Sequence, residues 1–492
     1  MRTKFFFAIV LLVAICVRLS ADNVVKIEGK GEYATLREAV NAAKSGDVIT
    51  MIANCEVNDG TIFVSDKAIV LDLNGKKITA NFETENCTLF QIQEGGESIT
   101  DGDLTITDLS KEQTGEITCL DQGKKTLILL KNNGKLTINA GNFTSPETST
   151  DGCCIISVSG GENATLTING GTFISTKGLG TIAYGVIDNS KETTINGGTI
   201  INSNNSTNIS SRTIHNTGSL RVLGGNIVSG NDAVYVSPAG KVVLSNAANV
   251  TGNITTAQSR PIDEYILSDA ANFNLSAPLT VGKISYNREN GGSFGTICLP
   301  FVPDANEAIT YYELRECDGS TLVLEKSSGF QINTPYIYYS EDKTFEVGTE
   351  TQITLDANSE TAMLMDKDGL QLKGVYKRSV VFAEETAEYD AQNASHILEP
   401  NSYYIKDDGF SKANGYFNIN PFRAYFTISN AVGSSRYELG VYDDLAALQP
   451  LVSESAEIET IYELGGAAIP HLKKGINIVK FSTGETRKVI VK

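Results

Sequence analysis

One histidine and two aspartates recur along this chain at a spacing that could bring them together. His215, in the segment RTIHN, follows Asp188 by 27 residues and precedes Asp232 by 17. Each interval is of the order of one structural repeat, so the three side chains could line one outward face. Imidazole and carboxylate groups gathered in this way transfer protons or bind metal ions. Three polar residues on solvated strands explain the same pattern more simply, and we favour that interpretation.

A second pair of acids could bind calcium. Asp101 and Asp103 flank Gly102, and carboxylate oxygens are the ligands that Ca²⁺ prefers. A tight turn accounts for these residues more simply. The chain contains no CxxC pair and no glycine-rich phosphate loop, so the sequence assigns no cofactor, with calcium as the one alternative.

The elements that would position these side chains are strands of a repeat. A short sequence motif occurs four times along the chain, and the starts of its copies lie 30, 27 and 27 residues apart. The copies are LTINAGNF (136–143), LTINGGTF (166–173), TTINGGTI (193–200) and LRVLGGNI (220–227). Each copy is an alternating strand, a turn on Asn-Gly-Gly or a variant of it, and the start of another strand. A fixed period of this size indicates units that bury their apolar faces only against their neighbours. The pattern predicts a parallel β-helix of about eight coils, roughly 40 Å long at about 4.8 Å per coil.

Aligning the coils predicts which residues face inward. Three apolar columns fall in register: Leu104, Leu136, Leu166 and Leu220; Ile106, Ile138, Ile168, Ile195 and Val222; and Phe143, Phe173, Ile200 and Ile227. A column of threonines, ending at Arg221, alternates with them and should face outward: Thr105, Thr137, Thr167 and Thr194. Strand alternation requires this division into inward and outward sets. Asn139, Asn169 and Asn196 repeat at the turn, where we expect each to hydrogen-bond to its equivalent in the next coil.

Both ends of the chain carry further signals. Residues 5–17 form a 13-residue apolar run behind Arg2 and Lys4, which predicts a signal peptide over 1–21. Residues 33–45 form an amphipathic pattern with a Thr35/Glu38 capping box, and this helix should close the open end of the β-helix. The period stops near residue 258. We therefore predict an all-β chain with a parallel β-helix over 22–258, an antiparallel β-sandwich over 259–452 and a short β-module over 453–492.

Charge and cysteine content restrict the partners and the covalent framework. The formal charge is −18, and loss of the signal peptide with Arg2, Lys4 and Arg18 takes it to −21. Such a chain is repelled by nucleic acid, and no later segment is apolar enough to span a membrane as a helix. Seven cysteines would remain, an odd and sparse set that is no disulfide framework. Cys55, Cys87 and Cys119 are each 32 residues apart and should stack in one column. The sequence leaves open whether Cys298 and Cys317 form a disulfide.

Several stretches resemble secreted and surface proteins of the Bacteroidota. ISYNRENGGSFGTICLPF (284–301), EPNSYYIKDDGF (399–410) and INPFRAYF (419–426) resemble one recurring module of those proteins. LKKGINIVKFSTGETRKVIVK (472–492) is similar to their short C-terminal module, which in some members directs export, although YELGGAAIP (462–470) lacks the usual Gly-Arg/Lys pair. The capped start and the coils resemble pectate-lyase-like right-handed β-helix proteins. The resemblance implies an exported protein at the cell surface, outside the cell or in the periplasm.

The same resemblance raises the question of catalysis. Pectate lyases use a cationic base, for which Arg212 and Arg221 are candidates, with Asp188 and Asp232 on neighbouring coils. Glycoside hydrolysis needs two carboxyl groups about 5–9.5 Å apart. The repeats contain none of the NTD, DD, GHG or RIK motifs typical of polygalacturonase-like enzymes.

Nearly every recurring residue in the repeats is explained as core, turn or strand. We therefore expect a non-catalytic platform for adhesion or for contact with a polysaccharide or surface glycan. Two alternatives stay open: a polysaccharide lyase or glycoside hydrolase with a site in a groove of the β-helix, and a rod that spaces a binding sandwich. The chain has no tryptophan, so tyrosines would have to supply any aromatic sugar contacts.

Overall fold

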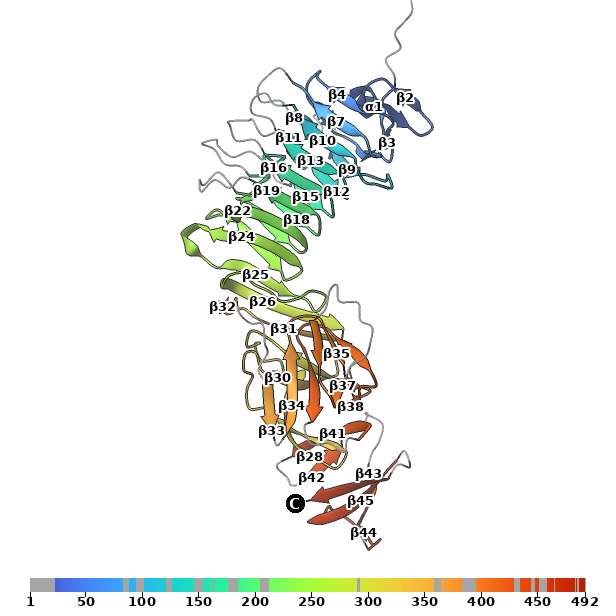
Figure 1. The fold of residues 1–492 in the computed structure, drawn as a ribbon, viewed down its shortest axis with the longest axis vertical. Helices are drawn as coiled ribbons and strands as arrows, with labels where there is room; N and C mark the ends of the chain where they lie inside the picture. Colours follow the sequence, from blue (N-terminus) through green and yellow to red (C-terminus); the bar gives the residue numbers. More distant parts are fainter. Residues whose placement is uncertain are drawn as a thin grey trace, which may run out of the picture.

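The computed structural model forms an elongated molecule in three parts, with the β-helix at one end and the C-terminal module at the other (Figure 1). It describes residues 23–491 except 83–87, 94–100, 121–125, 146–153, 162, 176–184, 204–211, 290–292, 358–363, 368, 383–394, 429–433, 444–446, 451–457, 464, 483 and 485. The predicted signal peptide, 1–21, lies outside the described residues. Among the helices of the described part, none is long and apolar enough to cross a membrane.

The first end of the β-helix is closed by a short helix, as predicted. Helix α1 (Leu36–Ala42) begins at Thr35, whose side chain accepts from the Glu38 amide while the Glu38 carboxylate accepts from the Thr35 amide. This reciprocal capping box satisfies two amides that the helix leaves without partners. Leu36, Ala39 and Val40 are buried beneath it, so the helix covers the apolar end of the first coil.

Sheet A supplies one face of every coil. Its strands, in spatial order, are β2 (Gly31–Tyr33), β1 (Val25–Ile27), β3 (Val48–Met51), β6 (Ala68–Asp72), β9 (Asp103–Thr107), β12 (Lys135–Ile138), β15 (Thr165–Ile168), β18 (Glu192–Ile195), β21 (Ser219–Val222), β23 (Lys241–Ser245), β25 (Ile262–Leu267), β26 (Leu279–Glu289) and β31 (Thr344–Thr349), and β32 (Ile353–Leu355) also pairs with β26. The ladder is parallel from β3 to β26.

Sheet B supplies the other two faces. The second face contains β4 (Cys55–Val57), β7 (Lys77–Ala80), β10 (Glu116–Cys119), β13 (Asn142–Ser145), β16 (Thr172–Ser175) and β19 (Thr199–Asn202). The third face contains β5 (Ile62–Val64), β8 (Thr88–Ile92), β11 (Thr126–Leu130), β14 (Ile156–Val158), β17 (Ile187–Asn189) and β20 (Ile214–Asn216). The long strand β22 (Gly225–Val236) pairs with both β19 and β20, and β24 (Ala248–Thr256) pairs with β22. The β-helix is therefore three-sided, with two of its faces joined at β22.

The predicted columns are confirmed by the strand register. Leu136 lies between Leu104 and Leu166, and Phe143 is paired with Phe173. The two phenylalanine rings stack with centroids 4.7 Å apart at 8°. The turn ladder is also present, because Asn169 Nδ2 donates to Asn139 Oδ1 at 2.9 Å and Asn196 Nδ2 donates to Asn169 Oδ1 at 2.8 Å. Close contact between identical neighbours holds the coils in register.

The two glycines of the Asn-Gly-Gly turn have different roles. A Cβ atom on Gly197 would lie 2.5 Å from the Asn169 carbonyl oxygen, so the first glycine permits close approach of the coil below. Gly198 has φ +86°, a left-handed conformation that favours glycine. The turn that recurs in the sequence is therefore fixed by both contact and backbone geometry.

One break in the leucine column has a structural cause. Thr193 occupies the leucine position on β18 and is buried, and its hydroxyl donates to Asn189 Oδ1 at 2.9 Å. Asn189 is itself fully buried and donates to Asn216 Oδ1 at 2.8 Å. A second, interior asparagine ladder thus replaces an apolar contact here, and buried polar groups of this kind require such partners.

The sandwich is largely antiparallel. Its main sheet orders β27 (Phe294–Cys298), β30 (Pro335–Ser340), β28 (Ile309–Asp318), β29 (Thr321–Lys326), β41 (Arg436–Asp443), β38 (Gly409–Lys412), β37 (Ser402–Lys406), β40 (Arg423–Ile428), β34 (Leu370–Val375) and β33 (Leu364–Lys367), with β42 (Ala447–Pro450) beside β41. A small sheet contains β36 (Ser395–Leu398), β35 (Ser379–Phe382) and β39 (Tyr416–Ile419). Two pairs, β29 with β41 and β35 with β36, are parallel.

Sheet A runs past residue 258 into the sandwich. Strands β25 and β26 continue its parallel ladder, and one cluster of buried apolar residues extends from Val25 to Phe422. Arg288, buried on β26, fastens this sheet to the next one, because its Nη2 donates to the Thr296 carbonyl on β27 and to the Tyr338 hydroxyl on β30, both at 2.7 Å. The β-helix and the sandwich therefore share a core rather than meeting through a linker.

The C-terminal module has its own small sheet and core. The sheet orders β44 (Ala468–Ile469), β43 (Ile458–Glu463), β45 (Gly475–Phe481) and β46 (Thr486–Val491). Its buried apolar residues are Val479, Phe481 and Val489.

A short 3₁₀ turn, η1 (Ala257–Ser259), precedes β25 in the body of the molecule.

The cysteine column prediction is wrong. On β7, which lies between them, Ile78 pairs with Cys55 and Ala80 pairs with Cys119. The two cysteines are therefore offset by two residues along the strands and do not share one column. Cys87 lies outside the described residues. Cys298 and Cys317 are both free thiols. Cys298 is buried in the core, where burial raises its pKa to about 12, and such a thiol is unreactive.

Candidate functional site

The third face of the β-helix places Asp188 beside His215. Strands β17, β20 and β22 pair in parallel, and their register aligns Asp188 with His215 and His215 with Tyr235. The neighbours of these residues, such as Ile187 and Ile214, are fully buried. Strand alternation therefore directs Asp188, His215 and Tyr235 outward. Together with Arg212, Asp232 and Thr255, which contact them or one another, we call these residues the polar cluster.

Asp188 and His215 form a hydrogen-bonded pair. Nδ1 of His215 lies 2.8 Å from Oδ1 of Asp188, and each side chain is 18% exposed. This contact engages Nδ1, so Nε2 is the ring nitrogen on the far side of the imidazole from Asp188. A carboxylate that orients an imidazole in this way is the arrangement found behind many general bases.

Tyr235 and Arg212 extend the pair toward the next coil. The Tyr235 ring stacks on the His215 ring, with centroids 5.7 Å apart at 16°. The Arg212 guanidinium carbon lies 3.3 Å from the centre of the Tyr235 ring, a cation–π contact. Burial lowers the pKa of Arg212, and Tyr235 and Asp232 act in the opposite direction. Its Nε is buried, and no hydrogen-bond partner for it lies in the described part of the chain.

Asp232 lies beside Tyr235 rather than in the column with His215. It pairs with Asn253 on β24, and its Oδ1 accepts from the Thr255 hydroxyl at 2.7 Å. Its Oδ2 is 3.8 Å from Arg212 Nε, a loose ion pair. Asp188 and Asp232 thus stand on β17 and β22, with β20 between them, about 9–10 Å apart along the axis by strand spacing alone. The ring of Tyr235 and the guanidinium of Arg212 lie on the path between them.

The remaining sequence candidates lie elsewhere. Arg221 is on β21 of sheet A, paired with Thr194 and Val243, and so belongs to a different face from His215. Asp101 forms an ion pair with Lys135 at 2.8 Å. Burial raises the pKa of Asp103. The Lys135 ammonium group lowers this pKa, and the Asp101 carboxylate raises it further. The Lys135 ammonium group thus engages the Asp101 carboxylate, and the described residues contain no group of three or more His, Cys, Asp or Glu side chains suited to a metal ion.

The sequence identifies Arg212 as a candidate base but gives no reason to place Tyr235 in the same site. Tyr235 lies in the segment AVYV, whose alternation of residues indicates only a strand. A tyrosine at an outward position, one coil after an outward histidine, was the signal that could have identified it. As a whole, the polar cluster offers an imidazole, two carboxylates, a guanidinium and a ring, which suits recognition of hydroxyl groups.

Comparison with family models, with curated proteins and with solved structures finds no match to this chain.

Proposed function

We propose that this chain is an exported, non-catalytic binding protein of the bacterial surface, and that it contacts a neutral glycan through the polar cluster. Export is supported by the apolar run at residues 5–17. A Bacteroidota origin rests on the resemblance of the segments 284–301 and 472–492 to surface proteins of that group. A neutral ligand follows from the strongly negative charge of the chain, which repels acidic polymers.

The observation that carries the proposal is the arrangement of the two carboxylates. Asp188 is hydrogen-bonded to His215, and Asp232 to Thr255. A hydrolase pair must flank one scissile bond at about 5–9.5 Å, whereas β20, Tyr235 and Arg212 separate these two acids. The groups are already hydrogen-bonded to one another, so such a preformed surface loses little conformational freedom when a ligand binds.

The sandwich offers less for sugar contact. Most of its described tyrosines are buried, and they include Tyr286, Tyr312, Tyr336, Tyr338, Tyr376, Tyr403, Tyr425 and Tyr437. Tyr416, at 62% exposed, is the clearest exception. Aromatic rings that fill a core cannot stack on a ligand, so the interpretation of the rod as a spacer for a binding sandwich is not favoured.

One observation favours the enzyme as a second candidate. The His215–Asp188 pair has the geometry of an oriented general base, and Arg212 adds a cation to the same polar cluster through its contact with Tyr235. Such an enzyme would be a polysaccharide lyase, because proton abstraction needs one base rather than two flanking acids.

A glycan-array screen of the mature chain, with detection of released sugar in the same assay, tests the proposal. We expect binding without turnover. Replacing Tyr235 or His215 with alanine should weaken binding about tenfold, since one lost ring contact or hydrogen bond is worth roughly 1–1.5 kcal/mol.

Arg221→Ala is the matched control, because Arg221 is an outward β-helix residue on another face. Its affinity should equal that of the unaltered chain. Turnover of any polysaccharide would contradict the non-catalytic proposal and favour an enzyme instead. Unchanged binding in both the Tyr235 and His215 variants would remove the polar cluster from the contact site.

A further inference from the structure

The β-helix ends unevenly, and the uneven end leaves a pocket. Sheet A continues through β25 and β26, whereas sheet B stops at β24, which pairs only with β22 within the described chain. The inward columns of sheet B therefore end at Val250, which is paired with Ile227, and at Ile254, which is paired with Val234. No further coil packs against them on this side.

The segment between β25 and β26 crosses this end, and it is held at both sides. Asn246 Nδ2 donates to the carbonyls of Ser268 at 2.9 Å and Ala271 at 2.7 Å. Phe273 is buried, and its amide donates to the Tyr376 carbonyl at 2.8 Å. Leu279 then enters β26, paired with Leu355. The crossing segment is thus anchored on both sides, and we call its residues 274–279, which span the gap, the arch.

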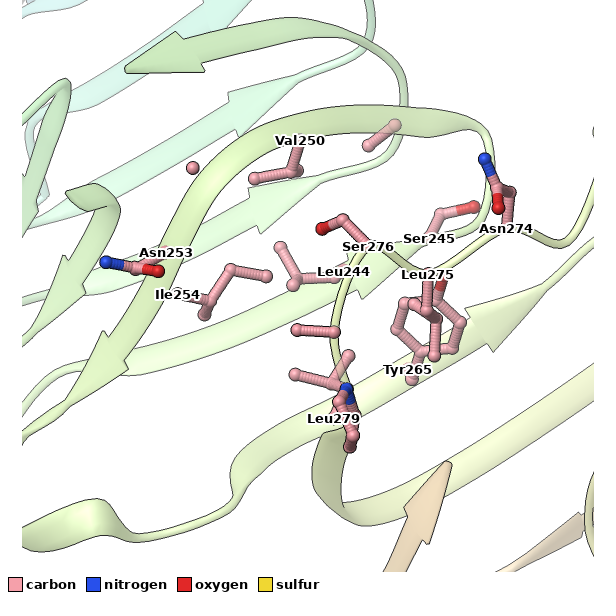
Figure 2. Close-up of a pocket in the computed structure, with 14 residues that line it drawn as sticks. Leu244, Ser245, Val250, Asn253, Ile254, Tyr265, Asn274, Leu275, Ser276 and Leu279 are labelled. Carbon is pink, nitrogen blue, oxygen red and sulfur yellow. The ribbon is translucent and has the colours of Figure 1, made fainter. Parts of the chain in front are cut away.

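A pocket of about 410 Å³ lies between the arch and β24. Figure 2 shows Val250 and Ile254 on β24, Leu244 and Tyr265 on sheet A, and Leu275 on the arch around the same space. Several lining residues, among them Asn274 and Ala277, are exposed, so the space is a pocket that opens to solvent and is accessible to a ligand. Its volume falls in the range of small-molecule sites, about 300–1,000 Å³.

The lining identifies the chemistry of the occupant. The apolar residues form the walls, and no residue that lines the pocket is charged. Asn253, Asn274 and Ser276 line it as well, and no hydrogen bond to their side chains occurs within the described part of the chain. By contrast, Asn226 on the coil below receives a hydrogen bond from Asn249 at 2.9 Å. The inner wall is formed by apolar side chains such as Leu244 and Tyr265, whereas Asn253, Asn274 and Ser276 are exposed at the rim. An uncharged site of this kind suits a neutral molecule with an apolar body that lies inside and a polar group that lies at the rim.

We infer that this pocket, between β24 and the arch 274–279, is a binding site for a neutral small molecule with an apolar body and one hydrogen-bonding group. The site is separate from the polar cluster and does not depend on the proposed glycan contact.

Phenylnaphthylamine, a neutral probe with an apolar body and one N–H group, tests the inference directly. Its fluorescence should rise on titration with the full mature chain. Ala248→Phe and Ala277→Phe place a ring into the pocket from two different walls, and each should weaken the probe's affinity by about tenfold or more. Ala247→Phe, on the exposed residue next to Ala248 and outside the lining, is the control and should bind as the unaltered chain does.

Two further comparisons keep the test decisive. Anilinonaphthalene sulfonate, a similar ring system with a negative charge, should bind about tenfold or more weakly because the lining offers no cation. Circular dichroism of each variant shows whether it is folded. If Ala248→Phe does not fold, Ala277→Phe on the exposed arch still provides the test. Absence of a fluorescence rise with the intact chain, equal affinity in the folded filled variants, or equal binding of the charged probe would overturn the inference.

Discussion

Replacing Phe173 with alanine is expected to lower the free energy of unfolding by about 3–5 kcal/mol. Phe173 on β16 is fully buried and stacks on Phe143 of the coil below, with centroids 4.7 Å apart. It also pairs with Ile200 of the coil above. Loss of the ring leaves a void between two coils that rigid ladders prevent from closing. The measurement is urea unfolding followed by circular dichroism, which reports the shift in midpoint.

The neighbouring Thr172 provides the control for this prediction. Thr172 lies on the same strand but at an outward, half-buried position. Thr172→Ala should change the free energy of unfolding by no more than about 0.5 kcal/mol. A Phe173 variant with the same midpoint as the Thr172 variant would show that the column of inward residues does not hold the coils together.

Replacing Asp108 with alanine is expected to lower the free energy of unfolding by about 3 kcal/mol. This buried carboxylate, at the turn after β9, accepts from the amides of Gly75 at 2.9 Å, Ser110 at 3.1 Å and Gly115 at 2.5 Å. Alanine leaves three amides without an acceptor, at about 1 kcal/mol or more for each. Asp108→Asn keeps the shape and one carbonyl oxygen, so its loss should be smaller. Urea unfolding of both variants at neutral pH measures the difference.

The contribution of Asp108 should depend on pH. Burial raises its pKa, but the proximity of the Ser110 side chain and hydrogen bonds from the amides of Gly115, Ser110 and Gly75 outweigh burial, and the pKa lies below its ordinary value. A group with a lowered pKa stabilises the fold fully above its unfolded pKa, about 3.9 for aspartate. The contribution is then lost as the pH falls through the folded value. The unfolding midpoints of the unaltered chain and Asp108→Asn should therefore converge as the pH falls below about 4. A constant difference down to pH 3 would contradict this account.

The sequence was sufficient for the parts of the fold that repeat. Leu136, Ile138 and Phe143 each have equivalents one coil away, and a column of buried residues must be apolar in every coil. The capping box of α1 could also be predicted from the sequence, because Thr35 and Glu38 are three residues apart and each accepts a hydrogen bond from the amide of the other. Such features depend on short-range contacts, which spacing along the chain reveals.

Features that depend on a single long-range contact were less accessible. Cys55 and Cys119 have the spacing of one column, yet turns of unequal length between the coils move them two residues apart. The end of the motif near residue 258 suggested the end of the ladder, although β25 and β26 continue it without the motif. Their inward residues, Tyr265 and Ile284, meet the sandwich core and so follow a different pattern.

The candidate site shows the same limit. The spacing of Asp188 and His215 indicated that they could share one outward face, although three separate polar residues were the favoured interpretation. The register aligns the two residues, and they are in contact. The pocket beneath β24 could not be foreseen, since it arises where sheet B stops and sheet A does not.

The continuous ladder of sheet A determines how the molecule bears force. A pull between the N-terminal cap and the sandwich acts along the long axis (Figure 1), and successive strands of sheet A are stacked in that direction. The load therefore acts parallel to the hydrogen bonds and opens them rung by rung instead of shearing many at once. Each 27-residue coil that opens would release about 90 Å of extended chain. In single-molecule pulling, the rod should lengthen in steps, with a step of about this size for each 27-residue coil, and it should behave as an extensible connection rather than a rigid one.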